Sequence, residues 1–372
     1  MKVASFRDLM REQANAAVQV SGAHHSSWNG RFGARIDPSS NTAGMAHWGH
    51  TISYNSRSVE EPLQEMFRNN RVHLQERDTL VGYRDAMRVV LHENVHLLAS
   101  EGNDHSQAEA AYNHAPGVHA IEEGVTELYS HRHLDDYIDE LGIDQVAPGI
   151  KDVRSGQVYK DLTPAVEGFA ETIERRSGVS RDQLVDQMAV VPADQKFSVA
   201  AQAIYDNSEL PGLIPSDQRD RAVAQIAQAL GRELHEVERL PDDAGGAERR
   251  TVGAKAAGAG YKAVSQLKKQ WQMPAPGHQV QRGVGAEQQQ TAQPGQGAQA
   301  GSGQVSQPGR GQGTQGPVSP GALPPDIAAA ARAGLSGPPL TSASRLSADR
   351  QGFRGTTSTT PAVQRQGPET QR

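Results

Sequence analysis

The chain of 372 residues contains no cysteine. This absence excludes disulfide frameworks, cysteine-ligated metal sites and a cysteine nucleophile, so any metal must be held by His, Asp or Glu. Aromatic residues make up only 5% of the sequence, whereas Gly (38) and Pro (21) are frequent, which is unusual for a wholly globular protein. The formal net charge is −6, so the composition gives no reason to expect a nucleic-acid partner.

Long apolar runs are also missing. No stretch approaches the roughly 20 apolar residues of a membrane span. Residues 1–19 carry charges at Arg7, Asp8, Arg11 and Glu12 and have no apolar run, so they predict an amphipathic helix rather than a signal peptide. We therefore expect a cytoplasmic protein, or one exported by a non-classical route, with no membrane partner.

The composition changes at residue 274. From Pro274 to Arg372, Gly, Pro, Gln, Ser and Thr dominate. Such a segment has too few apolar side chains to offset the loss of chain entropy, so residues 274–372 are predicted to form a disordered tail. The tail is interpreted as a tether, and contact with an unknown protein partner is the alternative. The rest divides into residues 1–150 and a helical region, 151–273, that completes or flanks the first part.

Local patterns predict strands first and helices afterwards. Gly33–Ile36 predicts a short strand and Gly44–Tyr54 a longer one, by alternation of apolar residues. Residues 60–100 predict helices, with a second start near Asp78-Thr79 and an end near Ser100. Further helices are expected at 118–141, 163–177, 193–207, 216–230 and 247–272, with a polar loop at 101–117 and a Ser180–Gln183 capping box opening another helix.

The stretch Val90–Ala99 contains the motif H-E-x-x-H, with His92, Glu93 and His96 in the motif positions. In an α-helix, residues four apart lie on one face, so the two imidazoles can bind one Zn²⁺ at about 2.0–2.1 Å. The Glu93 carboxylate can then reach a water in the open position of the metal. Apolar residues surround the motif, so the helix should be buried, and three buried ionisable residues need a partner such as a metal.

The helix expected at 118–141 carries a polar stripe. His119, Glu123, Glu127 and His131 are spaced by four and share one face. A metal held by the two motif histidines needs a third protein ligand, for which Glu123, Glu127, His119 and the later acids Asp135 and Asp136 are the candidates.

The pairing of H-E-x-x-H at residues 92–96 with E-G-x-x-E at residues 123–127 resembles the gluzincin branch of zinc metallopeptidases. This resemblance covers only the motif residues. It implies a small α+β, zincin-like domain in residues 1–150, with a short N-terminal β-sheet and an active-site helix. It also implies Glu123 as the third zinc ligand and Glu127 as an acidic residue that hydrogen-bonds a ligand histidine. The gap between the two motifs is longer than in the best-known members.

The activity implied is zinc-dependent hydrolysis of peptide bonds in a peptide or protein substrate. A zinc-activated water attacks, and Glu93 acts as general base and returns the proton to the leaving amine. The developing oxyanion needs a further donor, for which Tyr129 and His119 are the leading candidates and Tyr112 and His131 the others. Two competing functions remain: a non-catalytic, metal-stabilised interaction protein, and a zinc hydrolase of a non-peptide substrate.

Overall fold

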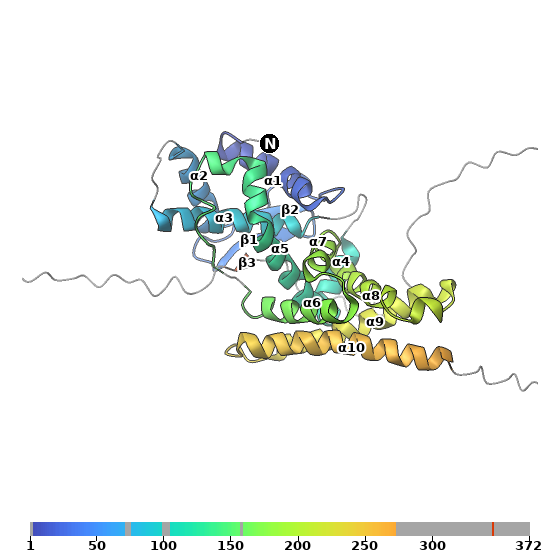
Figure 1. The fold of residues 1–372 in the computed structure, drawn as a ribbon. Coiled ribbons are helices and arrows are strands. Elements are labelled where there is room, and N and C mark those ends of the chain that lie inside the picture. Colours follow the sequence, from blue (N-terminus) through green and yellow to red (C-terminus); the bar gives the residue numbers. More distant parts are fainter. Residues whose placement is uncertain (1–2, 71–75, 99–104, 157–158, 273–343, 346–372) are drawn as a thin grey trace, which may run out of the picture. The chain divides into compact units, whose positions relative to one another are not determined.

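The computed structural model describes residues 3–70, 76–98, 105–156, 159–272 and 344–345 (Figure 1). They belong to one compact unit, Met1–Gln272 with Ser336–Arg372, and the second unit, Met273–Leu335, lies outside them. The predicted disorder of the tail also lies outside the described residues, apart from Ser344–Arg345. Within the described ranges, every helix is too short or too polar to serve as a membrane span.

The small sheet is a hairpin with one added strand. Strands β1 (Thr42–His47) and β2 (Thr51–Tyr54) are antiparallel, with Gly44 opposite Tyr54, and β3 (Ser344–Arg345) pairs with the other edge of β1. The prediction of one strand over Gly44–Tyr54 is therefore wrong. The backbone reverses between the strands, where His50 adopts φ 65°, and β1 packs against α3.

The short strand predicted at Gly33–Ile36 is also absent. Phe32 and Ile36 make only isolated bridges to the segment of β2 and the residue after it. The backbone N–H groups of Asn29 and Gly33 donate to His50 and Ile52, at 2.9 Å each. These bonds are too widely spaced for a continuous ladder, so the segment follows β2 as an irregular chain.

Five α-helices make up most of the other described residues in the first part. They are α1 (Phe6–Ser21), α2 (Glu61–Arg68), α3 (Arg77–Val95), α4 (Ser106–His114) and α5 (Val118–Leu141). The bounds of α5 match the prediction, because Gly117 and Gly142 at its two ends adopt φ 74° and 69°, which favour glycine. The prediction of a polar loop at 101–117 is wrong for Ser106–His114, which form α4. Ala108 and Tyr112 lie one turn apart on this helix, and both are buried.

Helix α3 ends at Val95 rather than near Ser100. The chain tightens after Val95, and the N–H of Leu97 donates to the carbonyl of Asn94. The carbonyl of Leu97 then accepts a hydrogen bond of 2.8 Å from the backbone of Ser27. The N-terminal loop thus takes the backbone groups that would have continued the helix, and His96 becomes the last residue in helical conformation.

Five further helices complete the fold: α6 (Thr163–Ser177), α7 (Arg181–Ala189), α8 (Lys196–Asp206), α9 (Arg219–Leu234) and α10 (Gly246–Gln272). Helix α10 runs alongside α6 (Figure 1), and a Cβ at Gly253 would overlap the carbonyl of Ala165. The capping box predicted for α7 does not form. Ser180 makes no side-chain cap, and the Glu174 carboxylate accepts from the Arg181 N–H instead, at 3.1 Å.

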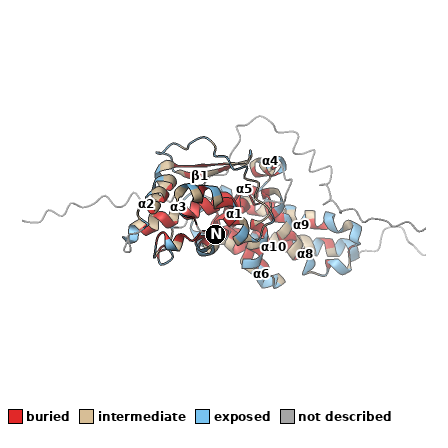
Figure 2. Cartoon of the chain, turned by 90° about the horizontal axis from the view of Figure 1, so that it is seen from above, coloured by how far each residue is buried: buried red, intermediate tan, exposed pale blue. Residues whose placement is uncertain are grey.

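The core is built around two helices. Every residue from 86 to 98 is buried, and so is every residue from 120 to 127 on α5. Figure 2 shows this burial along α3 and α5. The described chain is therefore mostly helical with a small sheet, which confirms the α+β class. Both segments that carry the motif residues lie in the core.

Candidate metal centre

Two histidines and one glutamate converge where α3 meets α5. Oε2 of Glu123 lies 3.5 Å from Nε2 of His92 and 3.7 Å from Nε2 of His96. One ligand atom from each residue lies within 4.8 Å of the other two, and all three residues are buried. This group could hold a metal ion. Within the part of the chain that the structure describes, no other group of His, Asp or Glu meets the same condition.

The imidazole of His92 is held from behind by Glu127. Oε2 of Glu127 lies 3.0 Å from Nδ1 of His92, and Nη1 of Arg88 donates to both carboxylate oxygens at 3.1 and 2.9 Å. Nε2 of His131 lies 3.0 Å from the other oxygen of Glu127. A carboxylate on Nδ1 favours a proton there and leaves Nε2 directed at Glu123, as a metal ligand requires.

The imidazole of His96 is held in the same way by Glu122. Oε1 of Glu122 lies 2.7 Å from Nδ1 of His96. Its other oxygen, Oε2, lies 3.2 Å from Nζ of Lys196, which is 1% exposed and donates also to the carbonyls of Met188 and Val191. Both ligand histidines therefore rest on a carboxylate that is itself paired with a buried cation.

Glu93 is anchored to the sheet. Its Oε2 accepts a hydrogen bond of 2.6 Å from the backbone N–H of Ala46 on β1. A Cβ placed on Gly44 would lie 2.7 Å from Oε1 of Glu93, so β1 passes directly over this carboxylate. The helix and the sheet thus fix the position of the acid that follows the first ligand histidine.

Two tyrosines border the cluster. The hydroxyl of Tyr112 on α4 donates to Oε1 of Glu123 at 2.6 Å. The ring of Tyr159 stacks on the ring of His92, with centroids 5.4 Å apart and planes 3° apart. Tyr159 has φ 53°, a rare conformation for a non-glycine residue, and its buried hydroxyl lies close to Glu123. Tyr112 is among the donors predicted from the sequence, whereas no local pattern indicates Tyr159.

The cluster contains more buried negative than positive charge. Its charged residues, each at most 2% exposed, are the acids Glu93, Glu122, Glu123 and Glu127 and the bases Arg88 and Lys196. With every group ionised, two negative charges remain in excess, which a divalent cation would neutralise.

The pKa values of the cluster are consistent with this excess of negative charge. Burial raises the pKa of Glu123, but the neighbouring His96 and His92 outweigh it and hold that pKa far below its usual range. Burial lowers the pKa of His92, yet hydrogen bonds to Glu123 and Glu127 and nearby negative charges raise it to about 10. A proton on His92 thus supplies positive charge that a metal ion would otherwise supply.

The remaining predicted site residues lie elsewhere or at the border. Tyr129 stacks on His133, with ring centroids 4.3 Å apart, and the structure does not bring it to the cluster. His119 lies 3.1 Å from Glu238 and touches the ring of Tyr112 with its edge, so it borders the site. The alternative acids are engaged elsewhere: Asp135 pairs with Arg84, and Asp136 with His133.

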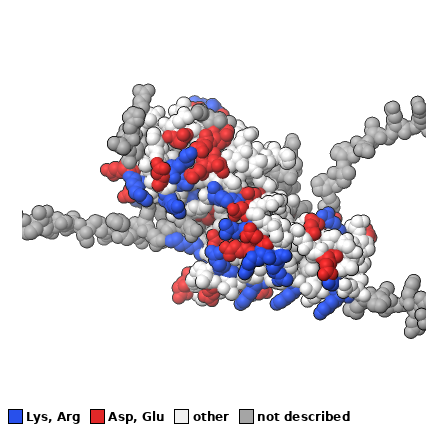
Figure 3. Space-filling model, in the orientation of Figure 1, with Lys and Arg blue, Asp and Glu red and all other residues white. Residues whose placement is uncertain are grey.

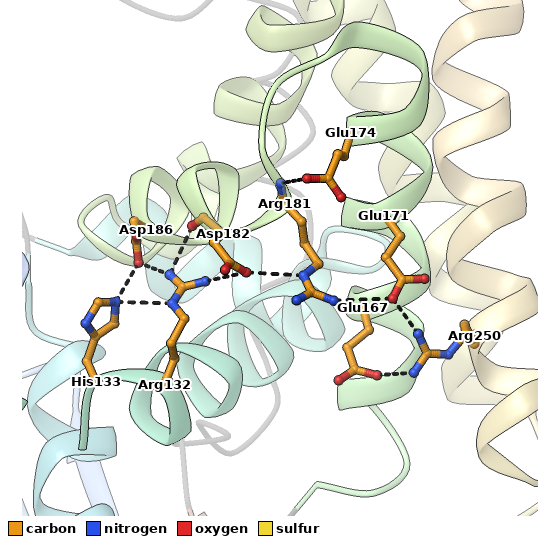
Figure 4. Close-up of polar contacts among 9 residues, drawn as sticks. All are labelled: Arg132, His133, Glu167, Glu171, Glu174, Arg181, Asp182, Asp186 and Arg250. Atoms are coloured by element: carbon orange, nitrogen blue, oxygen red, sulfur yellow. Dashed lines mark hydrogen bonds and ion pairs between the residues drawn. The ribbon is translucent and has the colours of Figure 1, made fainter. Parts of the chain in front are cut away.

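A second polar cluster lies at the surface between helices (Figure 4). Arg250 on α10 bridges Glu167 and Glu171 on α6, and Arg132 on α5 bridges Asp182 and Asp186 on α7. The first of these groups lines a groove of about 1040 Å³, and none of the residues that line it belongs to the His92 group. Acidic and basic residues are interspersed over this face (Figure 3). These ion pairs connect α10 to α6 and α5 to α7, so the cluster has a structural role.

Comparisons with protein-family models, with curated proteins and with solved structures found no match to this chain. The relation to gluzincins therefore stays a prediction carried by residues 92–96 and 123–127. Function has to be inferred from the residues of the site and their geometry.

Proposed function

We propose that the chain is a zinc-dependent metallopeptidase. The observation that supports it best is the buried group of His92, His96 and Glu123, with the carboxylate of Glu93 beside the first ligand and against a β-strand. Hydrolytic zinc sites combine three protein ligands with an adjacent acid in this manner.

The donor set suits zinc. Two imidazole nitrogens and one carboxylate oxygen are ordinary ligands of catalytic zinc, whereas structural zinc sites usually present four protein ligands. Both imidazoles are oriented by carboxylates on Nδ1, an arrangement typical of histidines that bind metal through Nε2. The excess of two buried negative charges matches one divalent cation.

Glu93 is the proposed general base. Zinc, when bound, would supply a Lewis acid that polarises the substrate carbonyl and lowers the pKa of water. Glu93 would accept the proton of the attacking water and deliver it to the leaving amine. The hydrogen bond from Ala46 holds one oxygen of Glu93 and keeps its carboxylate in place for both transfers.

Strand β1 is the proposed guide for the substrate. It passes over Glu93 at Gly44, and its edge opposite β2 carries β3. An extended peptide could be held at that edge by main-chain hydrogen bonds, and it would have to replace β3 there. Such binding would align a peptide bond with Glu93.

Tyr159 is the proposed donor to the oxyanion, in place of Tyr129. Its buried hydroxyl lies beside Glu123, the proposed third ligand, and would therefore be placed to donate to a substrate oxygen at the metal. Burial, and then the charges of Glu123 and Glu93, raise the pKa of Tyr159, so the hydroxyl keeps its proton. Tyr112 already donates to Glu123 and serves that ligand instead.

One observation favours a second function, that of a metal-stabilised protein without catalysis. His92 and Glu123 are fully buried, and Tyr159 covers the ring of His92. A closed site of this kind is typical of structural metal ions. On this alternative the four glutamates and the metal would stabilise the core, and Glu93 would serve only as an acceptor for β1.

Replacement of Glu93 by Gln separates the two functions. The amide keeps the shape of the side chain and removes its ability to accept a proton, so zinc content should stay unchanged. Hydrolysis of a mixed peptide library should fall by about 10²–10⁴-fold relative to the wild type. The surface variant Glu248→Gln is the matched control and should cleave normally. Full cleavage by Glu93→Gln would refute the mechanism, and a zinc-loaded wild type that cleaves no peptide would support the structural alternative.

A further inference from the structure

Two chains of charged groups support the two ligand histidines. The first runs from Arg88 through Glu127 to His92 and is built from α3 and α5 alone. The second runs from Lys196 through Glu122 to His96, and its cation comes from α8. We refer to the second chain, Lys196–Glu122–His96, as the Lys196 relay.

The amine of Lys196 has three polar contacts. Nζ donates hydrogen bonds to the carbonyl of Met188 at 2.8 Å and to that of Val191 at 3.2 Å, and it forms an ion pair with Oε2 of Glu122 at 3.2 Å. The two carbonyls belong to the end of α7 and the residues that follow it. The position of the amine is therefore set by the α7–α8 segment, residues 181–206.

Burial of such a pair needs a reason. Replacing a buried ion pair by apolar residues is often neutral or stabilising. An apolar pair such as Met and Leu would therefore stabilise the fold about as well as Lys196 and Glu122 do. Their placement has another consequence. Glu122 uses one oxygen for Lys196 and the other for His96, so the amine fixes the carboxylate and the carboxylate fixes the imidazole.

We propose that Lys196 is a positioning residue of the metal centre and that it acts on His96 through Glu122. The α7–α8 segment then contributes to the metal centre, and the affinity for the metal depends on how that segment packs against α5. This inference rests on the proposed metal function of His92, His96 and Glu123, and it adds a residue that no motif contains.

Zinc affinity measured by competition with a chelator tests the relay. Lys196→Met and Glu122→Gln should each weaken zinc binding by about 10–100-fold, the usual effect of removing a group that orients a ligand. The double variant should bind zinc no more weakly than Glu122→Gln, because Lys196 acts only through that carboxylate. Lys151→Met, which removes an exposed lysine paired with Asp139, is the control and should bind zinc as the wild type does.

The visible absorption spectrum of the Co²⁺-substituted protein is the second readout, because it reports the arrangement of the ligands. It should change in Lys196→Met, whereas a purely structural role would leave both the spectrum and the zinc affinity of the folded protein unchanged. Folding is checked by circular dichroism. If Lys196→Met fails to fold, the double variant is compared with Glu122→Gln instead. The double variant lacks both charges of the pair, so it leaves no unpaired charge in the core.

Three results would overturn the proposal. They are wild-type zinc affinity in folded Lys196→Met, wild-type affinity in Glu122→Gln, and a double variant whose loss is the sum of the single losses. Failure of the proposed metal function of His92, His96 and Glu123 would look different, because the wild type itself would then bind no zinc.

Discussion

Gly44 on β1 offers a test of how closely the sheet controls Glu93. A Cβ at this position would lie 2.7 Å from both Cγ and Oε1 of Glu93. Ordinary van der Waals contact begins at 3.4 Å, so the Gly44→Ala methyl group is about 0.7 Å too close and must displace the carboxylate. A Cβ placed in the same way on Gly49, in the turn between β1 and β2, would have no atom within 4 Å. Gly49→Ala is therefore the control.

The magnitude follows from this displacement. A shift approaching 1 Å in a group that acts on the substrate can reduce the rate by about 100-fold. We therefore expect Gly44→Ala to lower kcat/KM for a cleaved peptide by roughly that factor, with a loss of about 1–3 kcal/mol in the free energy of unfolding from overpacking. Zinc content should not change, because no ligand is touched. Wild-type kcat/KM in Gly44→Ala would refute the inferred position of the carboxylate, and an equal loss in Gly49→Ala would show that the effect is not local.

Two further predictions concern stability. Hydrogen bonds to Asp186 and then Asp136 outweigh burial and raise the pKa of His133, so its contribution is complete below about pH 6.5 and is lost as the pH rises through the raised value. In urea unfolding, His133→Gln should thus cost more stability near pH 5.5 than near pH 9, by less than about 1 kcal/mol, and a pH-independent cost would contradict this. Removal of metal by a chelator should lower the thermal midpoint by roughly 5–10 °C if the metal had been present at about 100 times its Kd, because about 2.7 kcal/mol is then lost. An unchanged midpoint after proven metal removal would argue against a metal in the core.

The sequence was sufficient for the elements whose signals are local. Pro116 and Gly142 indicated the bounds of α5, and four-residue spacing predicted that His92, on α3, and His96, its C-cap residue, face the same side. The choice of Glu123 came from the resemblance to gluzincins, since Glu122 and Glu127 on the same helix are acids too. The same resemblance indicated a carboxylate for one ligand histidine, and Glu127 lies at Nδ1 of His92.

The groups that the sequence could not reveal depend on tertiary contacts. No local pattern distinguishes Lys196 from other helical lysines, because its burial results from the packing of α8 on α5. Tyr159 lies in a segment without periodicity, so nothing local indicates that its ring covers His92. The early end of α3 results from pairing with Ser27, far away in the chain. Glu122 had a weak signal, as a second acid beside Glu123 on a buried stretch.

Elemental analysis of the purified chain tests the central claim most directly. The wild type should contain about one zinc ion per chain, and His92→Ala, which removes one of three protein ligands, should contain almost none. The surface variant His24→Ala should retain the wild-type content. A wild type without zinc, a different metal in its place, or equal zinc in His92→Ala would contradict the assignment of His92, His96 and Glu123 as a zinc site.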